Sequence, residues 1–165
     1  MQPSGLTLFW AWLTALVAAL SFGPSFAHVL EALPRLTVWS PDLWREATVF
    51  NAQFQYFLIV GAPLDMLAIA TPAALAFLLR QNGAAALVAG LGAGFFALAL
   101  LLWFTLVYPA NQVLATWTPG SIPADFDAVQ LRWETGHMAV AAAKLIGLAF
   151  IFFSLILAGR GQPAV

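Results

Sequence analysis

The sequence has no cysteine and very few charged residues. Only 8% of its 165 residues are charged, whereas soluble domains carry about 25%. The lack of cysteine excludes disulfides, thiolate metal sites, iron–sulfur clusters and covalently attached c-type haem. Any metal or haem would therefore have to be held by histidine, carboxylate or amide groups.

Basic side chains are also too few to form a nucleic-acid surface. Six Lys and Arg residues stand against seven Asp and Glu, which gives a formal net charge of -1. Proteins that hold a phosphate backbone need a clustered basic patch. We therefore expect no nucleic-acid partner.

The chain is instead rich in long apolar segments, and 62% of its residues are hydrophobic. Crossing the hydrocarbon core of a bilayer takes about 20 mostly apolar residues in a helix. Four stretches qualify, and they cover approximately residues 6–33, 52–79, 84–108 and 136–158. We predict an all-α fold, an integral membrane four-helix bundle of antiparallel up-down topology, with the lipid bilayer around a single domain over residues 1–165. No Lys or Arg precedes the first stretch, which favours a retained helix over a signal peptide.

The connections between these stretches determine the topology. Residues 80–83 form a tight turn, so the second and third helices make an antiparallel hairpin. The longer connections, 34–51 and 109–135, must both lie on the opposite side. Arg80 and Arg160 lie on the side of the termini, and by the positive-inside rule this weak bias predicts cytoplasmic termini and long loops outside.

Small residues and prolines give further expectations about packing. Ala86, Gly90 and Gly94 share one face of the third helix, which predicts close approach of another helix there. Pro63 and Pro72 remove backbone donors from the second helix, so we expect it to bend.

Both histidines occur in the same pattern with a glutamate, read in opposite directions. The pairs are His28-x-x-Glu31 in the first helix and Glu134-x-x-His137 at the start of the fourth. Residues three apart share a helical face, and both pairs lie at the loop-side end of the bundle. We therefore expect two imidazoles and two carboxylates to face one small volume. In the competing interpretation these groups are simply solvated at the headgroups, where charge costs little.

Such a set of side chains suits several cofactors. His28, Glu31, Glu134 and His137 are the candidate ligands of a single first-row transition metal. The spacing also occurs in di-iron bundles, but the two further glutamates of those sites are missing here. A b-type haem with His28 and His137 as axial ligands is the second option. A site without any cofactor is the third, and the spacing does not separate the three.

Other polar residues lie within or near the spans. Asn51, Gln55 and Asp65 lie along one stripe of the second helix, and Lys144 lies on the same face of the fourth helix as His137. Since an unpaired ammonium in lipid is costly, we predict an ion pair between Asp65 and Lys144. It would serve as a structural clamp or as a proton relay. Asn51, and with it Asn111 at the end of the third helix, is more typical of a helix cap than of a ligand.

Several short motifs together resemble those of a known family. They are Gly23-x-x-Phe26-x-His28 followed by Pro34, Pro109-x-Asn111, and Trp133-x-x-x-His137. In these the chain is similar to the anthrone-oxygenase-like family of small four-helix membrane proteins, much of which is a domain of unknown function. The basic residue that usually follows the fourth-helix histidine by three positions is absent, because Val140 stands there and the cation is Lys144.

The resemblance implies oxidation of a polycyclic aromatic phenol by dioxygen, without a metal. His28 or His137 would act as the base, since an imidazole titrates near neutral pH. Asn111 and Trp133 would bind and orient the substrate. The resemblance therefore makes these four residues the candidate catalytic group.

Three functional hypotheses of different classes follow. The first is a small membrane oxidoreductase, oxygenase-like, with its polar His/Glu site at the loop-side end of the bundle. The second is a non-catalytic accessory subunit of a larger membrane complex, or a homo-oligomer, in which the polar groups only hold the bundle together. A small transporter is a third, supported only by Asp65 and Lys144.

Overall fold

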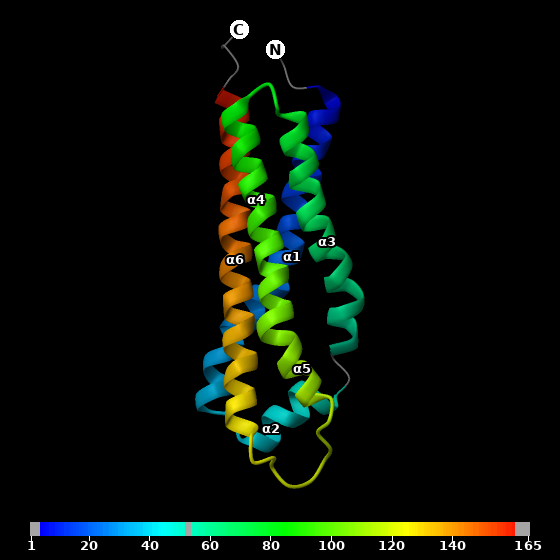
Figure 1. The fold of residues 1–165 in the computed structure, drawn as a ribbon, viewed down its shortest axis with the longest axis vertical. Coiled ribbons are helices and arrows are strands. Elements are labelled where there is room, and N and C mark those ends of the chain that lie inside the picture. Colours follow the sequence, from blue (N-terminus) through cyan, green and yellow to red (C-terminus); the bar gives the residue numbers. More distant parts are fainter. Residues whose placement is uncertain (1–3, 52–53, 161–165) are drawn as a thin grey trace.

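A computed structural model describes residues 4–51 and 54–160 of the chain, and throughout these ranges the regular structure is helical (Figure 1). The four long helices are α1 (Gly5–Thr37), α3 (Phe54–Leu78), α4 (Gly83–Leu102) and α6 (Phe126–Arg160). Helix α4 continues through a π-helical turn, η2 (Trp103–Val107), into α5 (Tyr108–Leu114). A short helix, α2 (Pro41–Arg45), and a second π-helical turn, η1 (Glu46–Phe50), lie between α1 and α3. The all-α prediction is confirmed.

The four helices form an antiparallel bundle. Helix α6 packs against α1 and α4, and α3 packs against the same two helices. Both ends of the described chain lie beside the α3–α4 turn, while α2, η1 and the segment between α5 and α6 lie at the opposite end (Figure 1). The predicted up-down topology is therefore correct.

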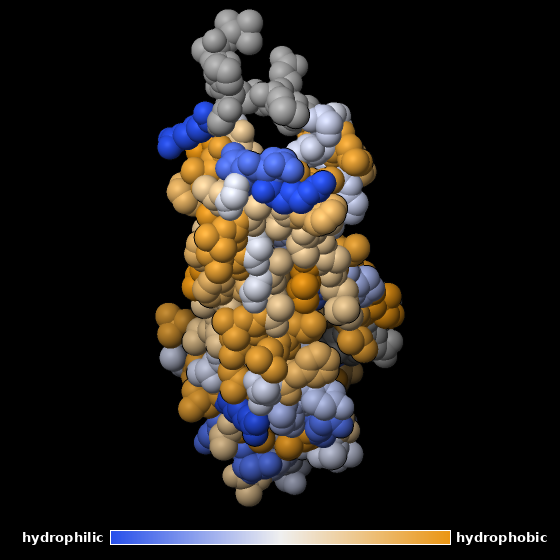
Figure 2. Space-filling view, turned by 45° about the horizontal axis from the view of Figure 1, so that its top comes forward, coloured by the Kyte–Doolittle hydropathy of each residue, from blue (hydrophilic) through white to orange (hydrophobic). Residues whose placement is uncertain are grey.

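The outer surface of the bundle suits a bilayer. Four helices are long and apolar enough to cross a membrane, and large apolar side chains such as Trp12, Leu87 and Phe77 are exposed on them. Figure 2 shows this apolar belt between two more polar ends. An apolar surface of this extent is unfavourable in water and favourable in lipid. The chain is thus a multi-pass integral membrane protein.

Helices α4 and α6 approach each other most closely at two glycines. A methyl group on Gly92 would meet Ile151 Cγ1 at 2.9 Å, and one on Gly147 would meet Phe96 Cδ2 at 2.9 Å. The packing face of α4 follows alternating steps of four and three residues along Ala85, Ala89, Gly92, Phe96 and Ala99, all buried.

The prediction that Ala86, Gly90 and Gly94 form this face is wrong. Gly90 and Gly94 are exposed, and a methyl group on either would meet nothing within 4 Å. The packing face is turned by one residue, which is about 100° around the helix. Small residues occur on both faces of α4, so their spacing alone could not select the buried one.

Three helical stretches extend beyond their predicted ends, and the one predicted to end at residue 108 continues through η2 and α5 to Leu114. Helix α1 runs through Pro34 to Thr37, and α6 begins at Phe126 rather than near residue 136. Pro34 removes only one hydrogen bond, and the following turn closes when Val38 N donates to Pro34 O at 2.9 Å. The added turns of α6 are polar, so hydropathy does not detect them. Since α6 has 35 residues, it is about 52 Å long, well beyond the hydrocarbon thickness of about 30 Å.

The loop-side end of the bundle is covered by α2 and its neighbours. Arg45, which is buried, donates from Nη2 to Thr118 O at 2.7 Å and from Nη1 to Gly120 O at 3.1 Å. Trp44, beside it, is also fully buried. These contacts fasten the segment between α5 and α6 to α2 and close the end of the bundle.

Candidate functional site

The two histidines meet, as the sequence predicts. The rings of His28 and His137 stack with centroids 4.2 Å apart and an interplanar angle of 18°. Trp133 contacts both, with centroid distances of 5.3 Å to His28 and 4.3 Å to His137. Phe57 of α3 lies 5.6 Å from the His28 ring. Three helices therefore contribute to one aromatic cluster at the loop-side end.

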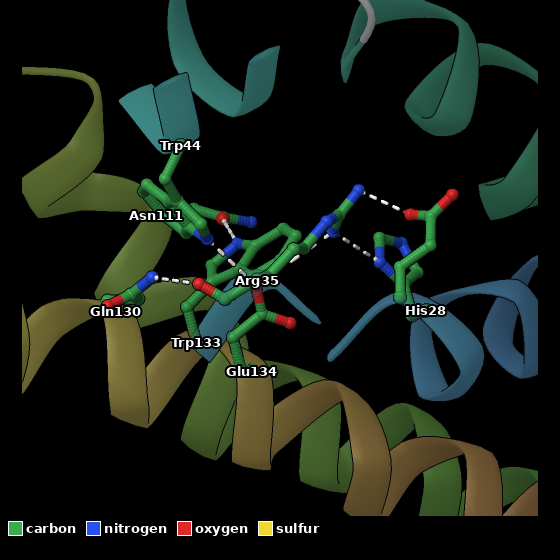
Figure 3. A network of polar contacts seen from close by, with 8 residues as sticks. His28, Arg35, Trp44, Asn111, Gln130, Trp133 and Glu134 are labelled. Carbon is green, nitrogen blue, oxygen red and sulfur yellow. Dashed lines mark hydrogen bonds and ion pairs between the residues drawn. The ribbon is translucent and has the colours of Figure 1, made fainter. Parts of the chain in front are cut away.

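Arg35 lies at the centre of the polar contacts around this cluster (Figure 3). Its Nη2 donates to Glu31 Oε2. Its Nη1 is 3.5 Å from His28 Nδ1 and 3.9 Å from Glu134 Oε1. The two carboxylates thus converge as expected, but on a guanidinium group.

The position of Arg35 follows from the geometry of α1. His28, Glu31 and Arg35 are spaced by three and four residues and therefore share a face of one helix. Gln130 of α6 fixes the end of α1 by donating from Nε2 to Arg35 O at 3.0 Å. The guanidinium also lies 5.7 Å from the centre of the Trp133 ring, a cation–π contact. Arg35 is not among the site residues predicted from the sequence, because the predicted first helix ends before Pro34 and leaves Arg35 in a loop.

Glu134 is buried behind the site. It is 0% exposed, and its Oε1 accepts a hydrogen bond from Trp44 Nε1 at 2.8 Å. Its Oε2 has no hydrogen-bond partner within the described part of the chain. The Trp44 and Trp133 rings meet edge to face, 5.6 Å apart. Glu134 therefore connects α2 to the site and helps to hold Arg35.

Of the two asparagines predicted to cap helices, Asn51 occupies the C-cap position of η1, whereas Asn111 has another role. Asn111 Oδ1 accepts a hydrogen bond from Trp133 Nε1 at 2.8 Å, so Asn111 neither caps a helix with this atom nor lines the cavity described below. It positions Trp133. Asn51 is exposed in the turn after η1, and the side chain of Gln55 lies outside the described residues.

A cavity of about 60 Å³ opens beside His28. It is lined by residues of α1, η1, α3 and α6, namely Pro24, Ala27, His28, Glu31, Arg35, Ala47, Thr48, Phe57 and Trp133. Two buried polar atoms of these residues, Arg35 Nε and Thr48 Oγ1, have no hydrogen-bond partner among the described residues. A ligand in the cavity would find a donor and a hydroxyl available there.

The geometry does not fit the predicted metal site. Across residues 4–51 and 54–160, no group of three or more His, Asp or Glu side chains is arranged to hold a metal ion. Of the predicted ligands, Glu31 bonds Arg35 and Glu134 bonds Trp44. The structure therefore gives no support to His28, Glu31, Glu134 and His137 as a metal ligand set, and both carboxylates face Arg35 instead.

A b-type haem fits no better. Two axial imidazoles bind the iron from opposite faces of the macrocycle, so the porphyrin lies between them. The rings of His28 and His137 instead stack directly on each other, 4.2 Å apart. That separation leaves no room for a porphyrin between the two rings.

A second polar cluster lies deeper in the bundle, and it confirms the predicted ion pair. Lys144 Nζ is 2.6 Å from Asp65 Oδ1. Ser21 Oγ donates to the same oxygen at 2.6 Å, and Lys144 Nζ also donates to Ser21 O at 3.2 Å. Pro24 has no amide hydrogen, so the carbonyl of Leu20, next to Ser21, lacks its usual helical donor. Sequence reasoning had no signal for Ser21, because serine is tolerated on any helix face.

No family model, no curated protein and no solved structure matches this chain. The resemblance carried by the short motifs therefore stays a prediction. The basis for a functional proposal is the arrangement of side chains around Arg35 and the cavity.

Proposed function

We propose that this protein is a membrane oxidoreductase, oxygenase-like in its chemistry, with its site at the cavity beside His28. One observation carries the proposal. An imidazole and a guanidinium, His28 and Arg35, line the same small cavity with His28 Nδ1 and Arg35 Nη1 3.5 Å apart. A base next to a fixed cation is an arrangement that removes a proton and stabilises the anion left behind.

The contact between His28 and Arg35 is open to a substrate. Its 3.5 Å length exceeds the usual range of about 2.7–3.2 Å for a hydrogen bond to nitrogen or oxygen. A substrate hydroxyl in the cavity gives its proton to His28 Nδ1. The oxyanion then accepts hydrogen bonds from the guanidinium group of Arg35, whose planar set of donors suits an anionic oxygen.

Dioxygen is the oxidant in this proposal. The electron-rich aromatic anion passes one electron to dioxygen, and the resulting radical and superoxide combine to form a carbon–oxygen bond. The proton held by His28 returns to the peroxide, so that substrate and dioxygen together become a hydroperoxide with no atom or electron left over. Loss of water from the hydroperoxide yields a ketone or quinone. The same chemistry is implied by the resemblance to the anthrone-oxygenase-like family.

The other predicted catalytic residues have supporting roles in this proposal. Trp133 lines the cavity and provides a wall for an aromatic ring. His137 is a positioning residue, because it stacks on His28, and Asn111 is another, because it holds Trp133. Glu31 orients Arg35. We further propose that the termini are cytoplasmic and that the site faces the outer side, as the weak positive-inside bias indicates.

The test is oxygen uptake by purified protein in lipid nanodiscs with a panel of electron-rich polycyclic phenols. Turnover should fall about 100-fold or more in His28→Gln, which removes the base and keeps the size of the side chain. His137→Gln should retain more activity than His28→Gln, and chelation with EDTA should leave the rate unchanged. Equal rates for wild type and His28→Gln would overturn the proposal.

The accessory-subunit hypothesis has one observation in its favour. The cavity, at about 60 Å³, is far smaller than the roughly 300–1,000 Å³ of ordinary ligand pockets. If that hypothesis is correct, native mass spectrometry of protein extracted from its own membrane with a mild detergent will detect a stoichiometric complex with a second chain. His28→Gln will then change neither the assembly nor any oxygen uptake.

A further inference from the structure

The cavity beside His28 has an exposed rim and a buried inner end. Pro24, Ala27 and Phe57 are exposed at the rim, and Glu31 is exposed with them. Thr48 at the inner end is only 4% exposed. The rim belongs to the sides of α1 and α3, so the cavity opens laterally.

The hollow at the end of the bundle is separate from the cavity beside His28. Its lining residues, Asp42, Leu43, Arg45, Glu46, Phe50, Pro119 and Gly120, include none of those that line the cavity. Helix α2 and the segment between α5 and α6 cover that end and are fastened together by Arg45. Figure 1 shows the N-terminal part of α3 leaning away from α4 toward this end. The route to the cavity therefore runs between α1 and α3, from the surroundings of the bundle.

Along the bundle axis, the cavity lies at about the boundary of the hydrocarbon core of the membrane. Gly5 begins α1, and His28 follows it by 23 residues, which is about 35 Å along the helix axis. The hydrocarbon core is about 30 Å thick. With the start of α1 at one boundary, the rim of the cavity lies close to the other, where the polar ends of amphiphiles collect.

The polar atoms at the inner end of the cavity are suited to bind an oxygen atom of a ligand. Arg35 Nε is a donor and Thr48 Oγ1 is a donor and acceptor, and both are buried without a partner among the described residues. Buried polar groups in this state cost free energy that a ligand hydroxyl recovers. The volume of about 60 Å³ accommodates a hydroxyl-bearing ring edge but not a whole polycyclic molecule, so the body of the ligand must stay outside, against the apolar rim.

We propose that the cavity binds the hydroxyl-bearing end of a lipophilic phenol or quinol that enters sideways from the bilayer between α1 and α3. The choice of a phenolic hydroxyl rests on the function proposed above, whereas the lateral route rests only on the rim and the covered end. The apolar body of the ligand remains in the lipid beside Phe57. Water-soluble phenols of the same acidity are then poor ligands.

The test measures binding of a brominated long-chain alkylphenol to the protein in nanodiscs under argon. The bromine quenches tryptophan fluorescence, and this quenching reports how much ligand is bound. The methyl ether of the same compound is the control for the hydroxyl, and bromophenol without the alkyl chain is the control for the chain. We expect the alkylphenol to bind at least about tenfold more tightly than either, the difference made by one hydrogen bond to a buried group.

Two variants test the route and the inner end separately. Ala27→Phe closes the rim and should abolish the saturable part of the quenching, which reports the site, and leave the non-saturable quenching of lipid-facing tryptophans such as Trp12. Ala19→Phe, the same change at an exposed position of α1 away from the cavity, should leave both parts unchanged. Thr48→Val should weaken binding of the alkylphenol about tenfold without affecting its ether. Circular dichroism verifies that each variant is folded.

The outcomes keep the two proposals distinct. Binding of the alkylphenol without oxygen uptake would remove the catalytic proposal and leave the lateral site. Equal binding of bromophenol and its long-chain derivative, or full saturable quenching in Ala27→Phe, would overturn the lateral site whatever the activity. His28→Gln should still bind the alkylphenol even though it does not turn over.

Discussion

The two polar clusters of this bundle differ in how completely their members satisfy one another. In the inner cluster, Asp65, Lys144 and Ser21 are joined by contacts of 2.6, 2.6 and 3.2 Å. None of the three lines the cavity. The outer cluster around Arg35 has contacts of 3.5 and 3.9 Å from Arg35 Nη1. Three of its buried atoms have no hydrogen-bond partner among the described residues, namely Arg35 Nε, Thr48 Oγ1 and Glu134 Oε2, and the first two belong to residues that line its cavity. Polar groups that satisfy one another's hydrogen bonds hold helices together, whereas polar groups with unsatisfied hydrogen bonds are available to a ligand.

The largest expected effect comes from breaking the inner cluster. Lys144→Met removes the cation that pairs with Asp65 and leaves the Ser21 hydroxyl as the partner of this carboxyl group. We expect a loss of about 3–5 kcal/mol in the free energy of unfolding, as on breaking a buried ion pair. Unfolding in mixed micelles by sodium dodecyl sulfate measures it. The double variant Lys144→Met with Asp65→Asn should recover most of the loss, because no charge then remains unpaired. A single variant as stable as the wild type would show that the pair is not a clamp.

The outer cluster should respond in activity rather than in stability. Arg35→Lys keeps the charge but removes the planar group that contacts Glu31 and His28 together. We expect turnover to fall about 100-fold, as on loss of one donor to an oxyanion, with a change in unfolding free energy of about 1 kcal/mol. Steady-state oxygen uptake and micelle unfolding on the same preparation separate the two. A large loss of stability with normal turnover would make this cluster a clamp as well.

A smaller effect is expected at Asn111, which accepts a hydrogen bond from Trp133 at the wall of the cavity. Asn111→Ala leaves the buried Nε1 of Trp133 without the acceptor seen here, which costs about 1–3 kcal/mol. Because Trp133 lines the cavity, we also expect a higher KM with a nearly unchanged kcat. Substrate titrations of the variant measure both constants. A fall in kcat at unchanged KM would instead assign Asn111 to the chemical step.

The smallest effect on stability is expected at Thr48. Thr48→Val removes a buried hydroxyl that has no hydrogen-bond partner among the described residues and replaces it with a group of nearly the same shape. The unfolding free energy should stay within about 0.5 kcal/mol of the wild type or rise slightly. Thermal unfolding in nanodiscs provides the value. A loss above about 2 kcal/mol would mean that Oγ1 has a partner in the membrane-embedded protein.

The sequence predicts the bundle and its inner cluster well, because lipid leaves few alternatives. A helix is the only open-chain structure that satisfies its own backbone in hydrocarbon, so four apolar stretches determine the fold. Asp65 and Lys144 are the ionisable residues deep in two spans, and an unpaired charge there is too costly. Their pairing could therefore be predicted without knowing the packing of the helices.

The outer cluster was only partly predictable. The spacing of the histidines and glutamates predicts that His28 and His137 meet. Pro34, however, has the character of a helix end, so the sequence places Arg35 in a loop rather than on α1. Trp44 as the partner of Glu134 depends on the path of α2, and short loop segments carry no periodic signal. Polar turns beyond the hydrocarbon have the composition of loops even when they are helical, and this hid the start of α6 at Phe126.

Because the helices are long, the thickness of the bilayer affects access to the cavity. Helices α1 and α6 exceed the thickness of the apolar layer, so the height of the rim between α1 and α3 relative to the lipid surface depends on acyl-chain length. In short-chain lipids Ala27 and Phe57 rise into the headgroups or the water, and in long-chain lipids they sink below the carbonyl level. Access to the cavity thus becomes a property of the host membrane as much as of the protein.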